Sequence, residues 1–160
     1  MCIRDREGFI PWPAHYSVDR ERVGHLEDVE QPPEPGSYGL GVEIFKEFAF
    51  EAAHRLPNVA PDHKCARLHG HSFQVSVHVS GPVDVRSGWV RDFRDISCAL
   101  APLLEVLDHR YLNEIDGLEN PTSELLARWI WHRLTGPLPG LSQVVVRETC
   151  NSGCIYRGEP

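Results

Sequence analysis

Hydrophobic alternation over residues 42–54 and 71–81 is the feature that most constrains the fold. In the first stretch, apolar side chains recur at every second position and the pattern ends at His54, which is typical of a strand with one apolar face. The second stretch begins at His71, places Phe73 and three valines on one face, and stops at a Ser-Gly-Pro sequence. Residues 55–68 are rich in proline, asparagine and aspartate and predict a loop. The two strands can therefore pair as a hairpin.

Two helices are predicted after these strands. Asp92 has the position of an N-cap, and apolar residues follow it at spacings of three or four. Pro102 stands inside that stripe and predicts a kink or a break. Thr122 or Ser123 caps the second helix, which ends at residues 136–137. The apolar stripes are Phe93, Ile96, Leu100, Leu103, Leu104 and Leu107 in the first helix, and Leu125, Leu126, Trp129, Ile130 and Leu134 in the second.

Two short strands, at residues 143–149 and 155–157, complete the pattern. The order strand, strand, helix, helix, strand, strand (ββααββ) predicts an α+β fold in which two helices cover one face of a four-stranded antiparallel sheet. We expect this domain to span residues 42–160.

Residues 1–41 have a different composition from the rest of the chain. They contain four arginines against eight acidic residues, and residues 31–37 include three prolines. No period of 2 or 3.6 residues precedes these prolines. We expect an extended or weakly ordered tail, or non-native sequence introduced by the choice of reading frame.

Charge and hydropathy exclude several classes of protein. With 16 basic against 23 acidic residues, the chain of 160 residues has a net charge of −7, which argues against a nucleic-acid backbone binder. No apolar run reaches the roughly 20 residues of a membrane-spanning helix. The first residues lack the apolar stretch of an export signal, and five cysteines cannot all pair within one chain, so we expect a reducing, cytoplasmic setting.

The strongest local signal is His69-Gly70-His71 at the start of the second strand. Residues two apart on a strand point to the same side, so both imidazoles lie on one face. If the strands form a hairpin, His54 lies beside them, and three neutral imidazoles with one open position are typical of a catalytic zinc site. Incidental histidines are the competing interpretation. Three other histidines, at positions 63, 78 and 132, have no partner at metal spacing.

Cys65 lies four residues before this pair, on the predicted loop. Three interpretations remain open for it: a fourth ligand that closes a structural zinc site, an inert thiol, or a reactive thiolate whose pKa is lowered by a nearby cation.

Two acidic positions have both a functional and an ordinary interpretation. Asp108 could orient the adjacent His109 for proton transfer, or the pair could be a solvated helix end. Glu148 interrupts an apolar strand, and its carboxylate could accept two parallel N–H bonds from a guanidine-like ligand edge. Alternation alone favours solvent exposure for Glu148.

Several motifs, taken together and in this order, resemble the 6-pyruvoyl-tetrahydropterin synthase family. The resemblance runs from residue 42 to residue 159 and does not include the tail. The motifs are FAFEAAHRL (48–56), HKCARLHGH (63–71), GWVRDF (88–93), LDHRYLN (107–113), ENPTSE (119–124), ETC (148–150) and CIYRG (154–158).

The resemblance implies a role for each matching residue. His54, His69 and His71 match the zinc ligands, and Cys65 matches the catalytic thiol. Asp108 and His109 match its relay partners. Glu148 matches the carboxylate that holds the pterin ring in the family, and Thr122, Ser123 and Thr149 match positions near it. The implied fold is the tunnelling fold (T-fold), and the implied assembly is a trimer stacked into a homohexamer with pockets at the subunit boundaries.

The resemblance also separates branches of the family. Three residues stand between Cys65 and His69, as in the carboxy-forming branch of the queuosine (7-deazapurine) pathway, whereas the pyruvoyl-forming branch usually has five. This implies a carbon–carbon lyase that converts 7,8-dihydroneopterin triphosphate to 6-carboxy-5,6,7,8-tetrahydropterin, acetaldehyde and triphosphate. The alternatives are a pyruvoyl-forming lyase, a non-catalytic module stabilised by zinc on Cys65 and the three histidines, and, ranked low, a cupin-type metal enzyme.

Overall fold

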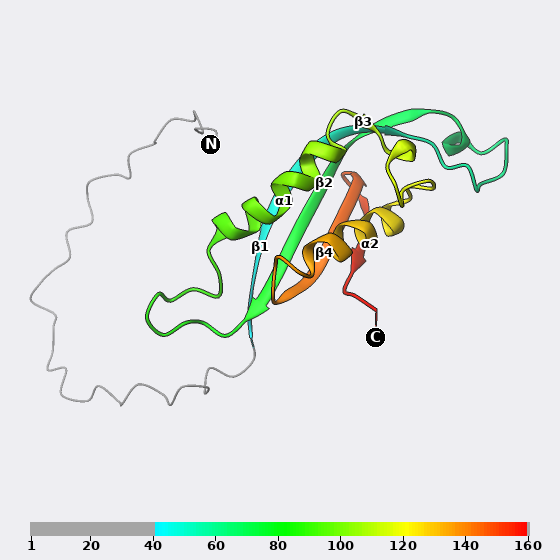
Figure 1. Ribbon diagram of the computed structural model, residues 1–160. Helices are drawn as coiled ribbons and strands as arrows, with labels where there is room; N and C mark the ends of the chain where they lie inside the picture. The colour runs from blue at the N-terminus through cyan, green and yellow to red at the C-terminus, as the bar shows by residue number, and fades with distance from the viewer. Residues whose placement is uncertain (1–40, 160) are drawn as a thin grey trace, which may run out of the picture. The chain divides into compact units, whose positions relative to one another are not determined.

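The computed structural model describes residues 41–159 (Figure 1). Apart from Gly41, the predicted tail at residues 1–41 lies outside this range, and its conformation remains a prediction. Five strands, two α-helices and two short 3-10 helices form the described part. In chain order they are β1 (Val42–His54), η2 (Lys64–Ala66), β2 (His69–Gly81), α1 (Phe93–Leu107), β3 (Arg110–Tyr111), η3 (Leu112–Glu114), α2 (Ser123–Leu134), β4 (Leu141–Thr149) and β5 (Ser152–Tyr156).

A long antiparallel hairpin forms the centre of the sheet. β1 and β2 pair without a register shift, from Val42 opposite Gly81 to His54 opposite His69. β4 pairs with β2 on the other side, and β5 pairs with β4, both antiparallel. The strand order is β3-β1-β2-β4-β5. The predicted hairpin and α+β class are therefore confirmed.

The predicted number of strands is wrong by one. β3 consists of two residues, which pair in parallel with Ala52 and Ala53 at the edge of β1. A strand of two residues is too short to show an alternating pattern, so nothing in the sequence periodicity indicates it. The sheet is consequently mixed, with four antiparallel strands and one short parallel edge.

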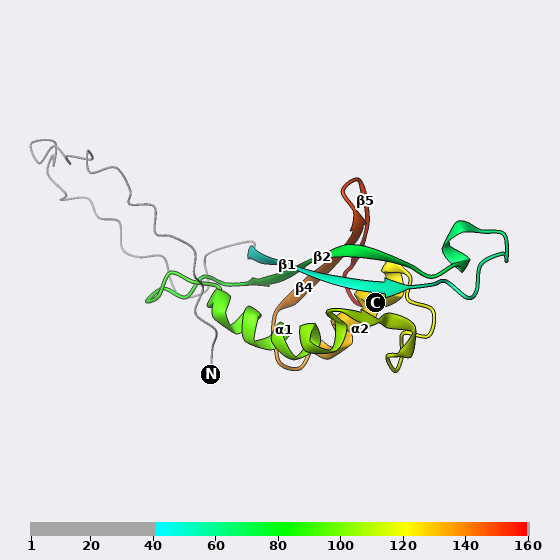
Figure 2. The same cartoon turned by 90° about the horizontal axis from the view of Figure 1, so that it is seen from above.

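Both helices cover the same face of the sheet (Figure 2). Asp92 caps α1 by accepting a hydrogen bond from the Arg94 N–H, and Thr122 caps α2 in the same way from the Leu125 N–H. α1 continues through Pro102, so the alternative of a break there is wrong. Pro102 lies on the exposed side, while Leu100 and Leu103 on either side of it pack against the core and hold the helix together. Within residues 41–159, no helix is both long and apolar enough to cross a bilayer.

The core lies between the sheet and the helices. Phe73, Val75, Val77 and Val79 are almost fully buried, as the alternation of β2 predicts. Two predicted core residues are instead exposed: Phe93 (51%) and Leu125 (39%), both in the first turn of a helix. Ala127 is buried on α2, a position that the predicted stripe lacks.

Candidate active site

The hairpin register brings three histidines together at one end of the sheet. His54 and His69 are directly opposite in the ladder, and His71 follows on the same face of β2. The ring centroids lie 4.5 Å apart for His54 and His69, 5.1 Å for His54 and His71, and 5.0 Å for His69 and His71. One nitrogen from each ring lies within 4.8 Å of the other two. These three residues could hold a metal ion.

Backbone carbonyls orient two of the rings. His54 Nδ1 lies 2.9 Å from the Pro121 carbonyl oxygen, and His69 Nδ1 lies 2.8 Å from the carbonyl oxygen of Arg67. A carbonyl can only accept, so Nδ1 carries the proton in both rings and Nε2 keeps a free lone pair. Metal-binding histidines in proteins are commonly held in this way.

The surroundings of His54 Nε2 show whether this site suits a metal ion. The residue is 1% exposed, and its Nε2 is buried without a hydrogen-bond partner. Burial lowers the pKa of His54 below 6.5 because desolvation disfavours the charged ring. A neutral, buried and unpartnered imidazole nitrogen is costly unless it coordinates something, and its chemistry suits a metal ion.

Glu148 lies beside this cluster. Its Oε2 is 3.9 Å from His71 Nε2, and its side chain is 24% exposed. The alternation argument for solvent exposure is therefore wrong: Glu148 shares the helix-covered face of β4 with the buried Val144 and Val146. From Val144 onward, even positions of β4 face the core, and at its end the same parity brings a carboxylate beside the histidines.

Cys65 lies on η2, in the loop that joins β1 to β2. Its carbonyl accepts a hydrogen bond from the Leu56 N–H (2.8 Å), and its N–H donates to His63 Nδ1 (3.1 Å). The thiol is free and half-buried. Among the described residues, the group of possible metal ligands at this place consists of the three histidines and does not include Cys65.

Asp108 and His109 form a second pair, immediately after α1. Their side chains are 2.9 Å apart, and His109 has a left-handed φ of 56°. Hydrogen bonds, first from the Glu51 N–H and then from His109, lower the pKa of Asp108 below 3.8. A cavity of about 530 Å³ is lined by both His109 and His71, so the fold brings His109 to the same hollow as one histidine of the cluster.

The three predicted hydroxyl residues occupy two places. Thr122 and Ser123 begin α2, directly after Pro121, whose carbonyl accepts from His54. Thr149 ends β4, and its hydroxyl contacts Asn151 and Ser152 in the turn to β5. Sequence reasoning did not find the carbonyls of Arg67 and Pro121, because every residue has a carbonyl and only the fold selects these two.

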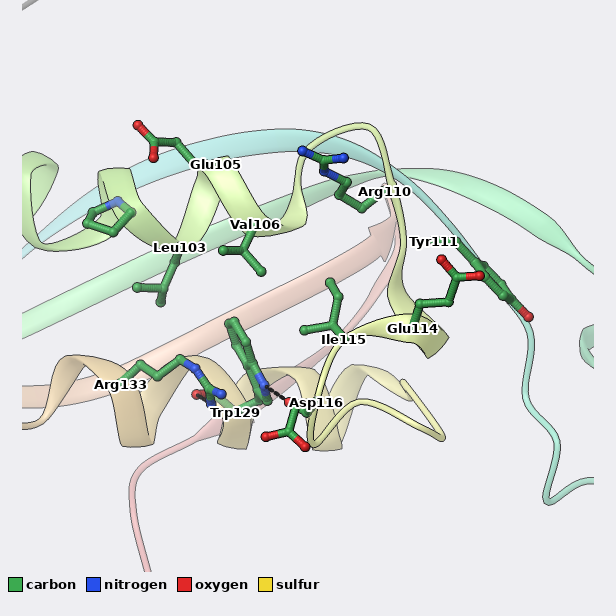
Figure 3. A pocket seen from close by; sticks show the side chains of 11 residues that line it. Leu103, Glu105, Val106, Arg110, Tyr111, Glu114, Ile115, Asp116, Trp129 and Arg133 are labelled. Carbon is green, nitrogen blue, oxygen red and sulfur yellow. Dashed lines mark hydrogen bonds between the residues drawn. The ribbon is translucent and has the colours of Figure 1, made fainter.

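A larger cavity, of about 720 Å³, lies between α1, α2 and the segment around η3 (Figure 3). Two of the side chains that line it already have partners: Trp129 Nε1 donates to the Asp116 carbonyl at 2.9 Å, and the Arg133 guanidinium stacks 3.6 Å above the Trp129 ring. None of the predicted site residues lines it. Size therefore does not identify the functional site here.

Comparison with known proteins decides the family. The model of the 6-pyruvoyl tetrahydropterin synthase family matches residues 43–159. The chain belongs to this family. It is 47% identical over 119 residues to a 6-carboxy-5,6,7,8-tetrahydropterin synthase of Synechocystis sp., covering 71% of this chain and 91% of the relative.

Two further relatives show the range of the family. A dihydroneopterin monophosphate aldolase of Pyrococcus furiosus is 37% identical over 101 residues, 63% of this chain and 82% of its own. The solved structure of the Caenorhabditis elegans 6-pyruvoyl tetrahydropterin synthase superimposes with a TM-score of 0.69 at 26% identity, covering 75% of this chain and 97% of that one. This member of the 6-pyruvoyl tetrahydropterin synthase family is therefore a lyase with the T-fold of its relatives, and three of its histidines could hold a metal ion.

Proposed function

We propose that the chain is a zinc-dependent carbon–carbon lyase of the carboxy-forming branch. The substrate is 7,8-dihydroneopterin triphosphate, and with consumption of water the products are 6-carboxy-5,6,7,8-tetrahydropterin, acetaldehyde and triphosphate. The 47% identical relative of that name supports the branch. The observation that carries the proposal is the convergence of His54, His69 and His71, with a buried, unpartnered Nε2, beside the Glu148 carboxylate.

His54, His69 and His71 would hold the zinc ion, each as a neutral imidazole. When bound, zinc supplies Lewis-acid stabilisation of negative charge developing on the substrate side-chain oxygens. The cluster offers three ligands, which leaves a coordination position for substrate.

Glu148 would bind the amino-pyrimidinone edge of the pterin. A carboxylate can accept two parallel N–H bonds from such an edge, and partial burial strengthens these bonds. Thr122, Ser123 and Thr149 would complete the ring pocket with hydroxyl groups. Arg55, Lys64 and Arg67 are exposed around the histidine end of the hairpin and would meet the triphosphate.

Cys65, as a thiolate, would take the proton from the carbon next to the ring. His109, oriented by Asp108, would then carry that proton onward, since Asp108 remains ionised at neutral pH and can hold His109 in one orientation. This division of roles requires a sulfur that is not a permanent metal ligand, which agrees with the all-histidine composition of the cluster.

Assembly into trimers that stack as a homohexamer is part of the same proposal. Within residues 41–159, β1 pairs on its outer edge at Ala52 and Ala53 alone, and β5 pairs on one side alone. Such edges are suited to pairing with another subunit, which would close the sheet and place pockets at subunit boundaries. We place the enzyme in the cytoplasm, in queuosine biosynthesis.

The decisive assay incubates zinc-loaded protein with 7,8-dihydroneopterin triphosphate and measures both acetaldehyde and the pterin side chain. We expect acetaldehyde and the 6-carboxy product in equal amounts. Turnover without acetaldehyde would contradict the proposal and favour a pyruvoyl-forming lyase or an aldolase. No turnover, with unfolding when the metal is chelated, would favour the zinc-stabilised module.

A further inference from the structure

The side chain of Asn113 joins two segments that flank the histidine cluster. Its Oδ1 accepts from the Arg55 N–H at 2.9 Å, while its Nδ2 donates to the Arg55 carbonyl at 2.8 Å and to the Glu119 carbonyl at 3.0 Å. Both protons of the amide group and its oxygen are therefore in use. All three partners are backbone groups.

These bonds continue the pairing of β1 beyond its last backbone partner. β3 pairs with Ala52 and Ala53 and then stops. The Asn113 amide presents a donor and an acceptor side by side, as a peptide group does. It binds both backbone groups of Arg55, which lies two residues beyond Ala53 and directly after the end of β1. The residue directly after His54 is thus fixed to the segment that leads to Glu119.

The third bond extends this link to the group that orients His54. Glu119 lies two residues before Pro121, whose carbonyl accepts the His54 Nδ1 proton at 2.9 Å. One side chain therefore fixes both ends of that hydrogen bond: the backbone next to His54 and the backbone next to Pro121.

We propose that Asn113 is a positioning residue for the metal centre. It holds the Pro121 carbonyl against His54 and so keeps the proton on Nδ1 and the free Nε2 pointed at the metal. The inference rests on the proposed function in one respect, that His54 binds the metal. Loss of a group that orients a metal ligand lowers metal affinity by about 10- to 100-fold.

The test uses two variants and a matched control. Asn113→Asp keeps the volume and an acceptor for the Arg55 N–H but places a carboxylate against two carbonyls; Asn113→Ala removes all three bonds. Asp84 also makes three hydrogen bonds, to the Arg86 N–H and to the N–H and hydroxyl of Ser87. Asp84 follows the end of β2 that is opposite to the histidines. The Asp84→Ala variant therefore controls for the loss of three side-chain hydrogen bonds in a loop away from the histidine cluster.

Three measurements separate positioning from simple stabilisation. They are the zinc dissociation constant against a competing chelator, the visible spectrum of the cobalt-loaded protein, and the tautomer of His54 from ring ¹⁵N shifts in the metal-free protein. We expect both Asn113 variants to bind zinc about 10- to 100-fold more weakly, with an altered cobalt spectrum and a mixture of His54 tautomers. Asp84→Ala is expected to lower the melting temperature and to leave all three unchanged.

The outcomes are distinct from those that test the proposed function. If the unaltered chain binds zinc and the Asn113 variants bind it equally well with an unchanged cobalt spectrum, the inference is wrong while the lyase proposal stands. If neither Asn113 variant folds, Asn113 is a folding residue and the positioning role is also wrong. If the unaltered chain does not bind zinc, the proposed function itself fails.

Discussion

The domain has two clusters containing histidine on opposite faces of the same sheet, and their ring nitrogens differ in what they contact. On the open face, His78 Nδ1 lies 3.1 Å from Glu43, and its Nε2 lies 3.0 Å from the Ser76 hydroxyl. Phe45 stacks on the ring at 5.2 Å. On the helix-covered face, the Nδ1 atoms of His54 and His69 are held by carbonyls, and the buried Nε2 of His54 has no partner.

This difference shows what distinguishes a binding site from a structural polar network. The open-face cluster, formed by Glu43, Ser76, His78, Ser80 and Ser142, satisfies its own polar groups. The helix-face cluster orients its rings and then leaves a donor atom without a partner. A protein accepts the cost of such an atom where a ligand compensates for it.

The largest expected effect comes from removing a ring on the helix face. His69→Ala should lose zinc and turnover together, with turnover falling about a thousandfold or more, because the metal contributes several kcal/mol to stabilising the transition state. Zinc content after dialysis and acetaldehyde release measure the two losses. His78→Ala, on the open face, is the matched control and should keep its zinc. Loss of zinc from both variants would remove the distinction between the clusters.

Cys65→Ala should separate chemistry from metal binding. Without its thiolate the enzyme lacks the proposed base, and we expect turnover to fall about 100- to 10,000-fold with zinc content unchanged. Metal analysis and single-turnover kinetics on the same sample give both values. If the variant also loses its metal, Cys65 is a ligand and the site is the closed, structural one.

Glu148→Gln keeps the shape of the side chain but removes the charge that would hold the pterin edge. We expect KM to rise about 10- to 100-fold, since charge-assisted hydrogen bonds contribute about 1.5–3 kcal/mol. Zinc content should not change. Glu47→Gln is the comparison on the open face, where the carboxylate pairs with Arg147 at 2.7 Å, and it should leave KM as it is. Equal changes in both variants would place the pterin elsewhere.

The smallest effect belongs to the open-face cluster and depends on pH. Hydrogen bonding, chiefly from the Ser142 hydroxyl, lowers the pKa of Glu43 below 4.5. The unfolded chain then binds this proton more readily than the folded one, so the stabilisation is present above pH 4.5 and is lost as pH falls through the folded-state pKa. We expect Glu43→Gln to show a slightly shallower loss of melting temperature in acid. The effect is small because the side chain is 43% exposed and solvent screens it. An unchanged slope would mean that the network does not favour the charged carboxylate.

Much of this arrangement could be predicted from local patterns. The alternation of β1 and β2 predicts that His54, His69 and His71 share one face once the strands pair, because a slip of one residue would turn the apolar set to the other face; the pairing of His54 with His69 then comes from the structure. Asp92 and Thr122 are identified as caps by their residue type and by the stripes that follow. These predictions depend on neighbours in the sequence or on one strand pairing.

Other features depend on contacts between distant segments and could not be predicted. The Pro121 carbonyl contacts His54 across 67 positions, and every residue has such a carbonyl. Asn113 bonds to Arg55 across 58 positions, and no sequence pattern indicates that partner. The burial of Glu148 could have been inferred from its parity with Val144 and Val146, but its closeness to His71 requires the β2–β4 pairing.

The measurement that tests the central claim most directly is X-ray absorption at the zinc edge of the metal-loaded protein. The account predicts three nitrogen ligands at about 2.0–2.1 Å and an exchangeable oxygen, with no sulfur. A zinc–sulfur distance of about 2.3 Å in the resting protein would contradict it, because Cys65 would then be bound to the metal and unable to act as the base.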